Sequence, residues 1–449
     1  MRRVRKETLI SLCAVVAVVA LVAGSLLTLQ QTSAQSRHST TSTIKGVSNA
    51  YADGGSLTLG AGSSSSSSVG ALYPATVGCS LSSAQQTSSG ASLGLNGGGQ
   101  GGAVTDTVSA SAYTSSVTVT SSSTVNAVNL LGGVITANTI VVKTHSSATT
   151  TTAGVSVDQT TFTNLKVNGQ SVNPTPNQTI SLAGIGTVVL DERIGLVNTF
   201  NNTSLTVNGI DVHITTPILG LPVGTQLIVG HAMSQFTRTA ASGLVGARSY
   251  GLHSTGVSGS LSALSGPYAF EVIGCYGGHG AVSLGATSLA SILSLGAMTD
   301  SAMGQIFPSY YPHPGATSEA TSTINSLGLG TVGTTLLNTG TINVQANASY
   351  VSSSNHSTSG SVTLTNGSIL SGLLPSPLPT NPGPNTQLSI PLLGTVTLNE
   401  QVVANTSNSV SIRVTAIDIA VTVPLNLLGL PVGAHIYIGV AGAYASLPS

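Results

Sequence analysis

Small polar residues alternate with β-branched residues along most of this chain. The alternation is clearest in four segments, which read TSSVTVTSS (114–122), NTIVVKT (138–144), SLTVNGIDVHI (204–214) and SVSIRVTAIDIAVTV (409–423). A period of two is typical of a strand that buries one face. Asn-Gly and Pro-Gly pairs between such runs predict turns, because Gly and Asn tolerate positive φ and Pro fixes φ. The pattern therefore predicts an all-β fold of sandwich-like or barrel-like domains.

Helix signals are sparse. After the apolar N-terminal segment, the best of them is the Ala- and Leu-rich stretch 288–298. A serine run at 63–68 and a glycine-rich stretch at 96–102 are typical of loops. We expect little helix beyond the N-terminal segment.

Two distant segments repeat one another with almost no gaps. The first contains GTVVLDE (186–192), VNGID (207–211) and LGLPVGTQLIVG (219–230), and the second contains GTVTLNE (394–400), VTAID (414–418) and LGLPVGAHIYIG (428–439). Fainter matches lie upstream, where Gly78-Cys79 corresponds to Gly274-Cys275 and STVN (123–126) corresponds to STIN (322–325). Self-similarity of this kind indicates a duplicated unit. It predicts two tandem domains of one type, at 40–238 and 248–447, with a linker at 239–247.

The N-terminus predicts export. Residues 1–7 are cationic, residues 9–29 are almost wholly apolar, and Thr32-Ser33-Ala34 offers small residues for a signal peptidase. We therefore expect a signal peptide at 1–34. The apolar run is also long enough to span a bilayer, so an uncleaved anchor fits as well. In both cases the rest of the chain is extracellular, either secreted or attached to the outer cell surface.

Composition narrows the possible partners. Only 5% of the residues are charged, and the formal net charge is zero, so no basic patch exists to replace the counterions of a nucleic acid. Aromatic residues make up 4% and Trp is absent, so stacking platforms are scarce. No cofactor is expected. The expected partner is a cell-envelope component or another surface protein, with the membrane contacted only through an uncleaved N-terminal segment.

Two acidic residues recur at equivalent positions of the repeat. Glu192 and Asp211 in the first copy correspond to Glu400 and Asp418 in the second. One hypothesis is that each pair lies on adjacent strands and forms a hard-cation site or an acid/base pair. The other is structural: the carboxylates accept backbone N–H bonds or meet a lone arginine such as Arg193 or Arg413. We favour the structural interpretation, because no DxDxDG-like ligand run is present.

Cys79 and Cys275 also occupy equivalent positions of the two copies. A disulfide between them would need the copies to face each other about a pseudo-two-fold axis, and export permits one. Two buried free thiols are the alternative. A catalytic thiol is disfavoured, because no His, Lys or Arg lies near either cysteine in the sequence.

Two further segments carry possible function. Gly90 to Gly94 reads GASLG, in which a hydrolase would use Ser92 as its nucleophile, but a Gly- and Ser-rich chain produces such a string by chance. The segment 307–314 is the densest aromatic and proline cluster, with Phe307, Tyr310 and Tyr311. It is either an exposed recognition loop or an ordinary packed loop, and we favour the packed loop.

The repeated half resembles a known family. In both copies a Pro-Asn pair (176–177 and 384–385) precedes the GTVxL(D/N)E strand, the V-x-(A/G)-I strand and the LPVG turn. This order of motifs resembles the choice-of-anchor P family of secreted actinobacterial and related surface proteins. The resemblance implies an exported β-rich domain of undefined biochemical activity, displayed at or released from the cell envelope. The final AGAYASLPS (441–449) is followed by no LPxTG motif, so any anchor is expected at the N-terminus.

Three functions follow as hypotheses. The first is a secreted or cell-surface structural or interaction protein of the envelope without catalytic activity. The second is an adhesin or glycan-binding module, for which the loop around Tyr310 is the local hint. The third is a secreted hydrolase, which lacks a convergent set of acid, base, nucleophile and metal ligands in the sequence. We favour the first.

Overall fold

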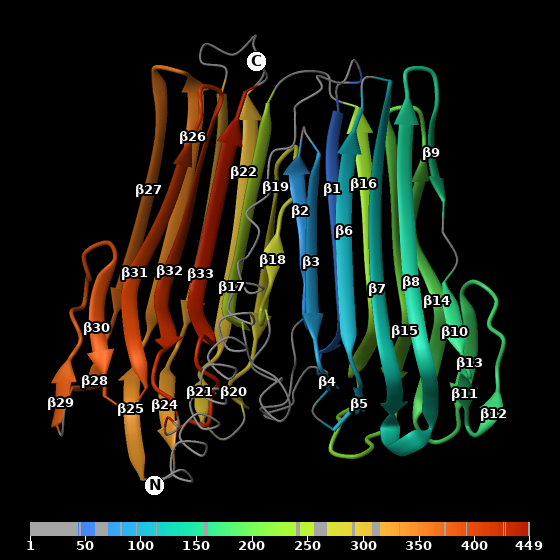
Figure 1. Cartoon of the computed structure of the whole chain (residues 1–449), viewed down its shortest axis with the longest axis horizontal. Coiled ribbons are helices and arrows are strands. Elements are labelled where there is room, and N and C mark those ends of the chain that lie inside the picture. Colours follow the sequence, from blue (N-terminus) through green and yellow to red (C-terminus); the bar gives the residue numbers. More distant parts are fainter. Residues whose placement is uncertain are drawn as a thin grey trace, which may run out of the picture. The chain divides into compact units, whose positions relative to one another are not determined.

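The computed structural model of the chain is built from antiparallel β-strands (Figure 1), which confirms the all-β prediction. It describes residues 44, 46–58, 71–80, 83–95, 97–113, 115–156, 160–238, 243–255, 267–289, 292–307, 315–331, 333–371, 374–391, 393–424, 426 and 428–447. The predicted signal segment 1–34, the serine run 63–68, and Tyr310 and Tyr311 lie outside these residues. In the part described, the one helical element is the short 3-10 turn η1 (Leu131–Gly133).

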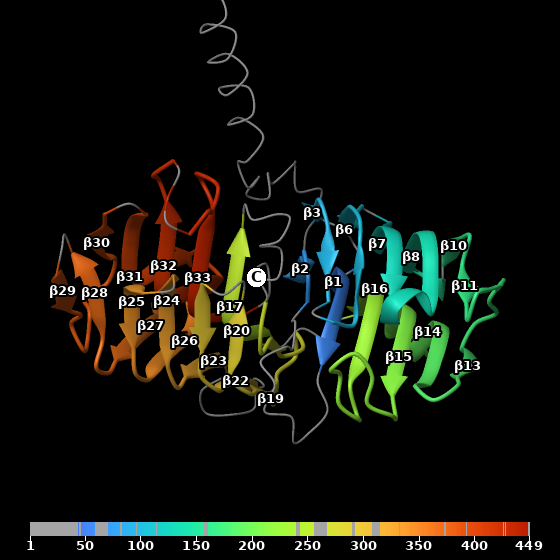
Figure 2. The same cartoon turned by 90° about the horizontal axis from the view of Figure 1, so that it is seen from below.

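The first half of the chain forms two sheets that pack on each other (Figure 2). Sheet I contains, in spatial order, β13 (Gln178–Leu182), β14 (Gly186–Asn198), β15 (Asn202–Ile214), β16 (Gln226–Arg238), β1 (Gly46–Thr58) and β2 (Ala75–Ser80). The path of sheet II is β12 (Gln170–Ser171), β11 (Lys166–Val167), β8 (Ile135–Thr149), β7 (Ser116–Leu130), β5 (Gly99–Gly101) and β4 (Leu93–Gly94). Beside this path lie β6 (Val104–Ala112), β3 (Ala84–Gly90), β9 (Ala153–Ser156) and β10 (Thr161–Thr163).

The second half forms three sheets. Sheet III contains β18 (Glu271–Val272), β17 (Leu244–Thr255), β33 (His435–Ser446), β32 (Ser409–Val421), β31 (Gly394–Asn405) and β30 (Thr386–Ile390). Sheet IV contains β19 (Gly278–Leu284), β22 (Met298–Phe307), β23 (Gly315–Ile324), β26 (Ile342–Ser352) and β27 (Asn355–Leu364). Sheet V contains β20 (Thr287–Leu289), β21 (Leu293–Leu295), β24 (Leu327–Thr331), β25 (Thr334–Thr339), β28 (Ser368–Ser371) and β29 (Leu374–Pro377).

Sheets I and III have the same strand order. In each, the first strand of the half pairs with the last strand, as β1 with β16 and β17 with β33, and the short β2 or β18 lies at the edge. This shared order is the structural counterpart of the repeated motifs. The second layer differs, because the continuous strands β7 and β8 of sheet II correspond to strands divided between sheets IV and V.

The boundaries at 40–238 and 248–447 stay predictions, because residues 39–449 form one compact unit. The predicted linker is too long at its C-terminal end. Leu244 to Ala247 already belong to β17, where they pair with residues 443–446 of β33.

The strongest local helix signal after the N-terminal segment does not form a helix, and one loop prediction was wrong in part. The stretch 288–298 contains parts of β20 and β21 rather than a helix, because Leu293 and Leu295 are buried on either side of the exposed Ser294 and pair with β24. Tertiary pairing overrides the helix propensity of Ala and Leu here. In the glycine-rich stretch, Gly99 to Gly101 form β5.

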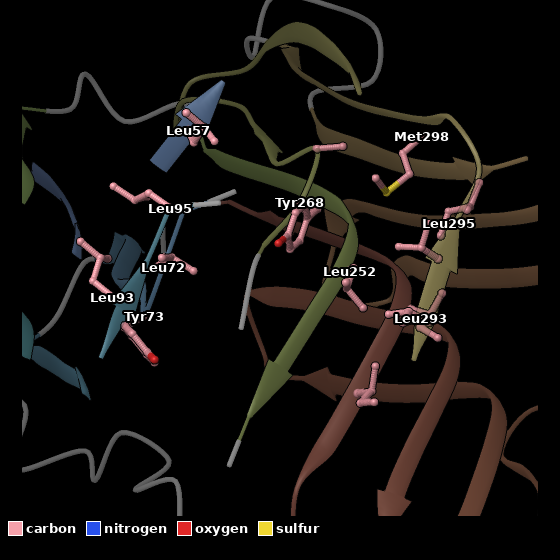
Figure 3. Packing of buried hydrophobic residues seen from close by; sticks show 14 of the residues in the cluster. Leu57, Leu72, Tyr73, Leu93, Leu95, Leu252, Tyr268, Leu293, Leu295 and Met298 are labelled. Carbon is pink, nitrogen blue, oxygen red and sulfur yellow. The ribbon is translucent and has the colours of Figure 1, made fainter. Parts of the chain in front are cut away.

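The core lies between the paired layers. Inner-face side chains of the long strands are buried, such as Leu205, Val207, Ile210 and Val212 on β15. Figure 3 shows part of this cluster, including the fully buried Tyr268. With so few charges in the chain, apolar burial and backbone hydrogen bonding must supply most of the stability.

One row of residues interrupts the pleat of sheet I. Four neighbouring strands each carry one residue of this row, and these residues lie opposite one another: Asp191, Gly209, Gly230 and Gly54. None of the four takes part in the regular antiparallel pairing, although the register is the same on both sides of the row. Sheet III has the same row at Asn399, Ala416, Gly439 and Gly251. We call these the interruption rows.

The interruption rows explain the repeated motifs. Asp191 and Asn399 have φ of 48° and 51°, a region that Asp and Asn tolerate better than other side chains, which accounts for the alternation of D and N in the GTVxL(D/N)E motif. The asparagine of each Pro-Asn pair stabilises this backbone conformation. Asn177 accepts a hydrogen bond from the backbone N–H of Arg193 at 2.7 Å, and Asn385 accepts one from Gln401 at 2.9 Å.

The rows also let the second layer approach closely. A Cβ atom at Gly54 would lie 2.5 Å from Val104, and one at Gly209 would lie 2.9 Å from both Ile140 and Val142. Across the row the side chains change face, so that Val207 and Ile210 both point inward. The residues next to them, Asn208 and Asp211, therefore share the outer face.

Replacing a glycine of the row tests this close approach. Gly230 and Gly184 have φ of 70° and 71°, but a Cβ at Gly230 would lie 3.0 Å from Val142, whereas the space at Gly184 is open. We expect Gly184→Ala to cost about 1–2 kcal/mol for the left-handed backbone alone. Gly230→Ala should cost a further ~1–3 kcal/mol for overpacking. Urea denaturation measures both, and equal costs would show that the second layer does not depend on the row.

Candidate functional site

The outer face of sheet I carries a connected set of polar side chains. Glu192 on β14 accepts a hydrogen bond from the Asn208 amide on β15 at 2.8 Å, and Nδ1 of His231 lies 2.7 Å from Oδ1 of Asn208. Asp211 is 1% exposed, and its Oδ2 accepts a hydrogen bond from Gln226 at 2.8 Å and lies 3.3 Å from Nε2 of His213. Side chains from β14, β15 and β16 thus meet at one place.

The structure brings Glu192 and Asp211 together. Burial raises the pKa of Asp211 to about 6, and the interaction with the Glu192 carboxyl group adds to the rise, while the hydrogen bond from Gln226 and the charge of His213 oppose it. Two carboxyl groups that interact in this way hold a proton at a higher pH than a lone carboxyl group does. Arg193 does not neutralise the pair, because it bonds to Asp191 at 2.8 Å.

The equivalent acids in the second half have protein cations as partners. Glu400 lies 3.4 Å from the Arg413 guanidinium, and Asp418 lies 3.0 Å from Nδ1 of His435. The hydrogen bond with Asp418 is the main cause that raises the pKa of His435. The structural interpretation therefore describes the second half, with Arg413 in the role the sequence suggested.

The two halves differ in charge at this place. The ladder register puts Thr206 at the position of Arg413 and Gln226 at the position of His435. The first half therefore keeps both carboxyl groups and lacks both of these cations. His213 lies beside Asp211, and its side chain is 45% exposed.

The core contains two buried acids that were not among the residues predicted from the sequence. Asp106 on β6 and Asp300 on β22 are both 0% exposed, and none of their carboxyl oxygens has a hydrogen-bond partner. They lie opposite Ser123 and Ser322, the first residues of the repeated STVN and STIN motifs. Each serine hydroxyl donates to a backbone carbonyl oxygen, of Asp53 at 2.9 Å or of Tyr250 at 3.4 Å. The matching strings VTD and MTD upstream were the available signal.

Burial favours the neutral form of both acids. Burial raises the pKa of Asp106 to about 9 and that of Asp300 to about 8. A charge at either place would lose its hydration, and the nearby hydroxyl group of Ser123 or Ser322 opposes the rise in pKa only in part. Asp53, 5% exposed on β1, also has a raised pKa because of burial, which the charge of His231 opposes.

Ring contacts link the two halves. Starting from the first half, successive rings in contact are His231, Tyr51, Phe270, Tyr250, His253, Tyr437 and His435. On β17 and β33 the rings of His253, Tyr437 and His435 are nearly parallel, with interplanar angles of 14° and 15°. Because these rings lie against each other, they cover one another's faces rather than form a flat platform.

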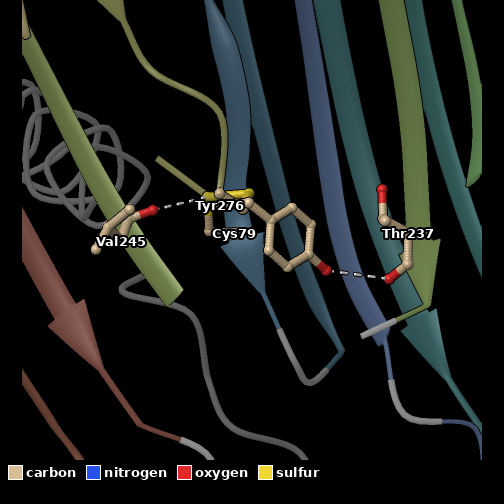
Figure 4. Close-up of a disulfide and its surroundings, with 5 residues drawn as sticks. Cys79, Thr237, Val245 and Tyr276 are labelled. Carbon is tan, nitrogen blue, oxygen red and sulfur yellow. Dashed lines mark hydrogen bonds between the residues drawn. A yellow bond between two sulfur atoms is a disulfide. The ribbon is translucent and has the colours of Figure 1, made fainter. Parts of the chain in front are cut away.

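A disulfide joins Cys79, which lies within β2, to Cys275 beyond β18 (Figure 4). Its S–S distance is 2.05 Å and its Cα–Cα distance is 5.2 Å. It therefore connects equivalent positions of the repeat. Tyr276 donates a hydrogen bond to the carbonyl oxygen of Thr237 at 3.4 Å beside it. Val47 and Leu244 pack near Cys275, which is 6% exposed.

The remaining sequence candidates carry no site. Ser92 lies between β3 and β4, so the strand–turn–helix context of a hydrolase nucleophile is missing, and its carbonyl oxygen accepts a hydrogen bond from Tyr73 at 2.7 Å. Phe307 ends β22, and the rest of its predicted loop is outside the described residues. Among the residues described, no three or more His, Cys, Asp or Glu side chains form a group that could hold a metal. No helix in the same residues is long and apolar enough to cross a membrane.

Comparison with known proteins adds one partial match. Residues 101–205 match the model of a domain of unknown function (DUF8256), a span that begins at the end of β5 and ends within β15. No curated protein and no solved structure matches the chain.

The buried acids predict an unusual dependence of stability on pH. In the unfolded chain Asp106 and Asp300 would titrate near 3.8, well below their pKa values in the folded protein. As pH rises between these limits, the unfolded chain releases protons that the folded protein retains. Stability should therefore fall from pH 5 to pH 8, by up to about 1.4 kcal/mol per pH unit for each acid.

Denaturation in urea at both pH values measures this fall. In the double variant Asp106→Asn with Asp300→Asn the fall should be clearly smaller, whatever the change in absolute stability, while Asp53 and Asp211 still contribute. An unchanged fall would mean that the two acids do not stay protonated in the folded protein.

Proposed function

We propose that this chain is an exported structural or interaction protein of the cell envelope, without catalytic activity, that carries two linked β repeats. The observation that carries the proposal is the disulfide between Cys79 and Cys275. Structural disulfides persist outside the reducing cytosol and are rare within it. Because the bond joins equivalent positions of the two repeats, it links the repeats covalently into one unit, as a structural protein requires.

Features of the sequence support the same proposal. Residues 1–34 have the charge, apolar run and small residues of a signal peptide. The low charge and the repeated motifs fit the resemblance to the choice-of-anchor P family. In the second half the repeated acids Glu400 and Asp418 bond to protein cations, which is a structural use of acidic residues.

Cell fractionation tests the location. With a tag after Ser449, we expect the protein in the medium or on the surface of intact cells, where a protease added outside removes it. A variant that lacks residues 1–34 should remain in the cytoplasm when it is expressed in the same cells. Recovery of the full chain in the cytoplasm, protected from the protease, would contradict the proposal.

A retention assay tests the partner. The purified mature chain should be retained on an envelope fraction of the producing cells, and retention should survive removal of glycans if the partner is a surface protein. Retention that is lost with the glycans would instead support the glycan-binding alternative. For that alternative Phe307, Tyr310 and Tyr311 of the predicted recognition loop are the residues to replace first.

A further inference from the structure

We propose that the edge strand β27 pairs with β27 of a second copy of this chain, in antiparallel orientation and about a two-fold axis. The surface concerned lies at the outer end of the second half, where β27 is the outermost strand in the upper part of Figure 1. The proposal does not depend on the function proposed above, because it rests on the sheet edge alone.

The first argument is a row of unused backbone groups. β27 ends sheet IV and pairs with β26 alone among the described strands. The carbonyl oxygen of Gly360 accepts a hydrogen bond at 3.1 Å from Gln401 of β31, so the backbone groups of Gly360 point away from β26. Those of Thr358 and Val362, two residues to either side, point the same way. In the part of the chain described, no hydrogen bond uses the backbone N–H and C=O groups of these two residues.

The second argument is that β27 lacks the devices that guard sheet edges. Edge strands of natural proteins are kept short, or carry charges, prolines or bulges, because an open edge pairs with other chains. β27 has ten residues, among them no Asp, Glu, Lys, Arg or Pro. It pairs with β26 without a shift of register from Ile342 to Tyr350. The edge is therefore long, regular and uncharged.

The other edges of the described sheets are guarded or face the other half. β4, β12, β13, β18, β20 and β30 have at most five residues, and β29 contains Pro375 and Pro377. The part of β14 beyond β13 has a bulge that includes Gly195, whose φ is 62°. The edge strands β2, β3 and β19 lie in the middle of the molecule (Figure 1). Among the described sheets, β27 is thus the one long edge strand that faces outward without a guard.

The first half shows the same edge in a guarded form. β26 corresponds to β8, because a Cβ atom at Gly439 would lie 2.9 Å from Val344, as one at Gly209 would lie 2.9 Å from Val142. Beyond β8 lie two separate strands, β9 and β10, of four and three residues. Beyond β26 lies the single strand β27. The long continuous edge is therefore a feature of the second half.

The lack of charge argues for a second copy as the occupant. A two-fold axis through antiparallel strands brings residues near the middle of β27 close to their own counterparts, where any charge would meet a like charge. The exposed side chains there are Ser357, Ser359 and Ser361. Their hydroxyl groups can both donate and accept hydrogen bonds, so each can pair with itself. The strand is compatible with its own copy and offers no charge that would select a partner of opposite charge.

A second copy also covers apolar surface beside the edge. β30 pairs only with residues 394–398 of β31, and β31 continues beyond it to Asn405. Gln401 reaches from β31 to β27 across the two layers, and Val403, two residues further on, points to the same side. Val403 is 48% exposed. A strand added beyond β27 extends sheet IV over this side chain and removes apolar area from water.

The edge is held in shape before a partner arrives. The ring of His356 stacks on that of Tyr350 of β26, with an interplanar angle of 16°. The Tyr350 hydroxyl donates a hydrogen bond to the carbonyl oxygen of Ser407, in the turn between β31 and β32. These contacts fix one end of β27, so that pairing costs less conformational entropy.

Sedimentation equilibrium of the purified chain without residues 1–34 tests the proposal. The unaltered chain should change from monomer to dimer as its concentration rises. Thr358→Pro removes an outward N–H without breaking the ladder to β26, and should weaken the dimer about tenfold or more, because two hydrogen bonds are lost per dimer. Thr358→Ala keeps the N–H and should dimerise like the unaltered chain. An unaltered chain that stays monomeric, or a dimer unaffected by Thr358→Pro, would overturn the proposal.

Charge variants test the two-fold axis without a change to the backbone. Ser359→Lys and Ser359→Asp each place like charges near one another, and each should weaken the dimer several-fold at low salt while circular dichroism shows an intact fold. A mixture of the two variants should form a heterodimer tighter than either homodimer. The same two substitutions at Ser294, an exposed position on β21, should leave dimerisation unchanged. A mixture that associates no more tightly than the separate variants would contradict the pairing of β27 with itself.

Discussion

The interruption row of each six-stranded sheet is the constraint on which the rest of the structure depends. It places small residues where the second layer comes closest, as at Gly54 beside Val104 and at Gly251 beside Met298. It also changes the face to which side chains point. Because of that change, Asn208 and Asp211 lie on one outer face, three residues apart, with Glu192 next to them. The core and the candidate site thus have the same geometric origin.

The two halves share the strand order of sheets I and III, but the partners of their acidic side chains differ. Both halves retain a buried acid opposite a serine in the core, and both retain a Glu and an Asp on the outer face. In the second half both outer acids have cationic partners, whereas in the first half Asp211 has His213 beside it and Glu192 accepts a hydrogen bond from the Asn208 amide. The chain has only 5% charged residues, and acids nevertheless recur at three equivalent places of the two halves.

Much of the frame could be predicted from the sequence. Alternation identified the long strands, and the motifs VNGID and VTAID located the repeated hairpin, although their meaning as interruption rows needed the ladder register. The stretch 288–298 was misleading because local propensity carries no information on the pairing of β21 with β24. The sequence hypothesis placed Glu192 and Asp211 on adjacent strands, and β14 and β15 are neighbours in sheet I.

Other parts of the site could not be predicted. The burial of Asp106 and Asp300 could not be predicted, since a single acid between two small hydroxyl residues fits an exposed strand equally well. The partners of the outer acids, Gln226 and His435, come from a third strand, and only register brings them there. The division of the second layer into sheets IV and V could not be predicted either, because it depends on where long strands are broken.

The proposed export of this protein depends most on the bond between Cys79 and Cys275, which joins equivalent positions of the two repeats. The most direct test is mass spectrometry of the protein taken from its producing cells, alkylated before any reduction and then digested. The account predicts a cross-linked peptide that contains Cys79 and Cys275, which separates into two peptides on reduction. Alkylated Cys79 and alkylated Cys275 in the unreduced protein would contradict it.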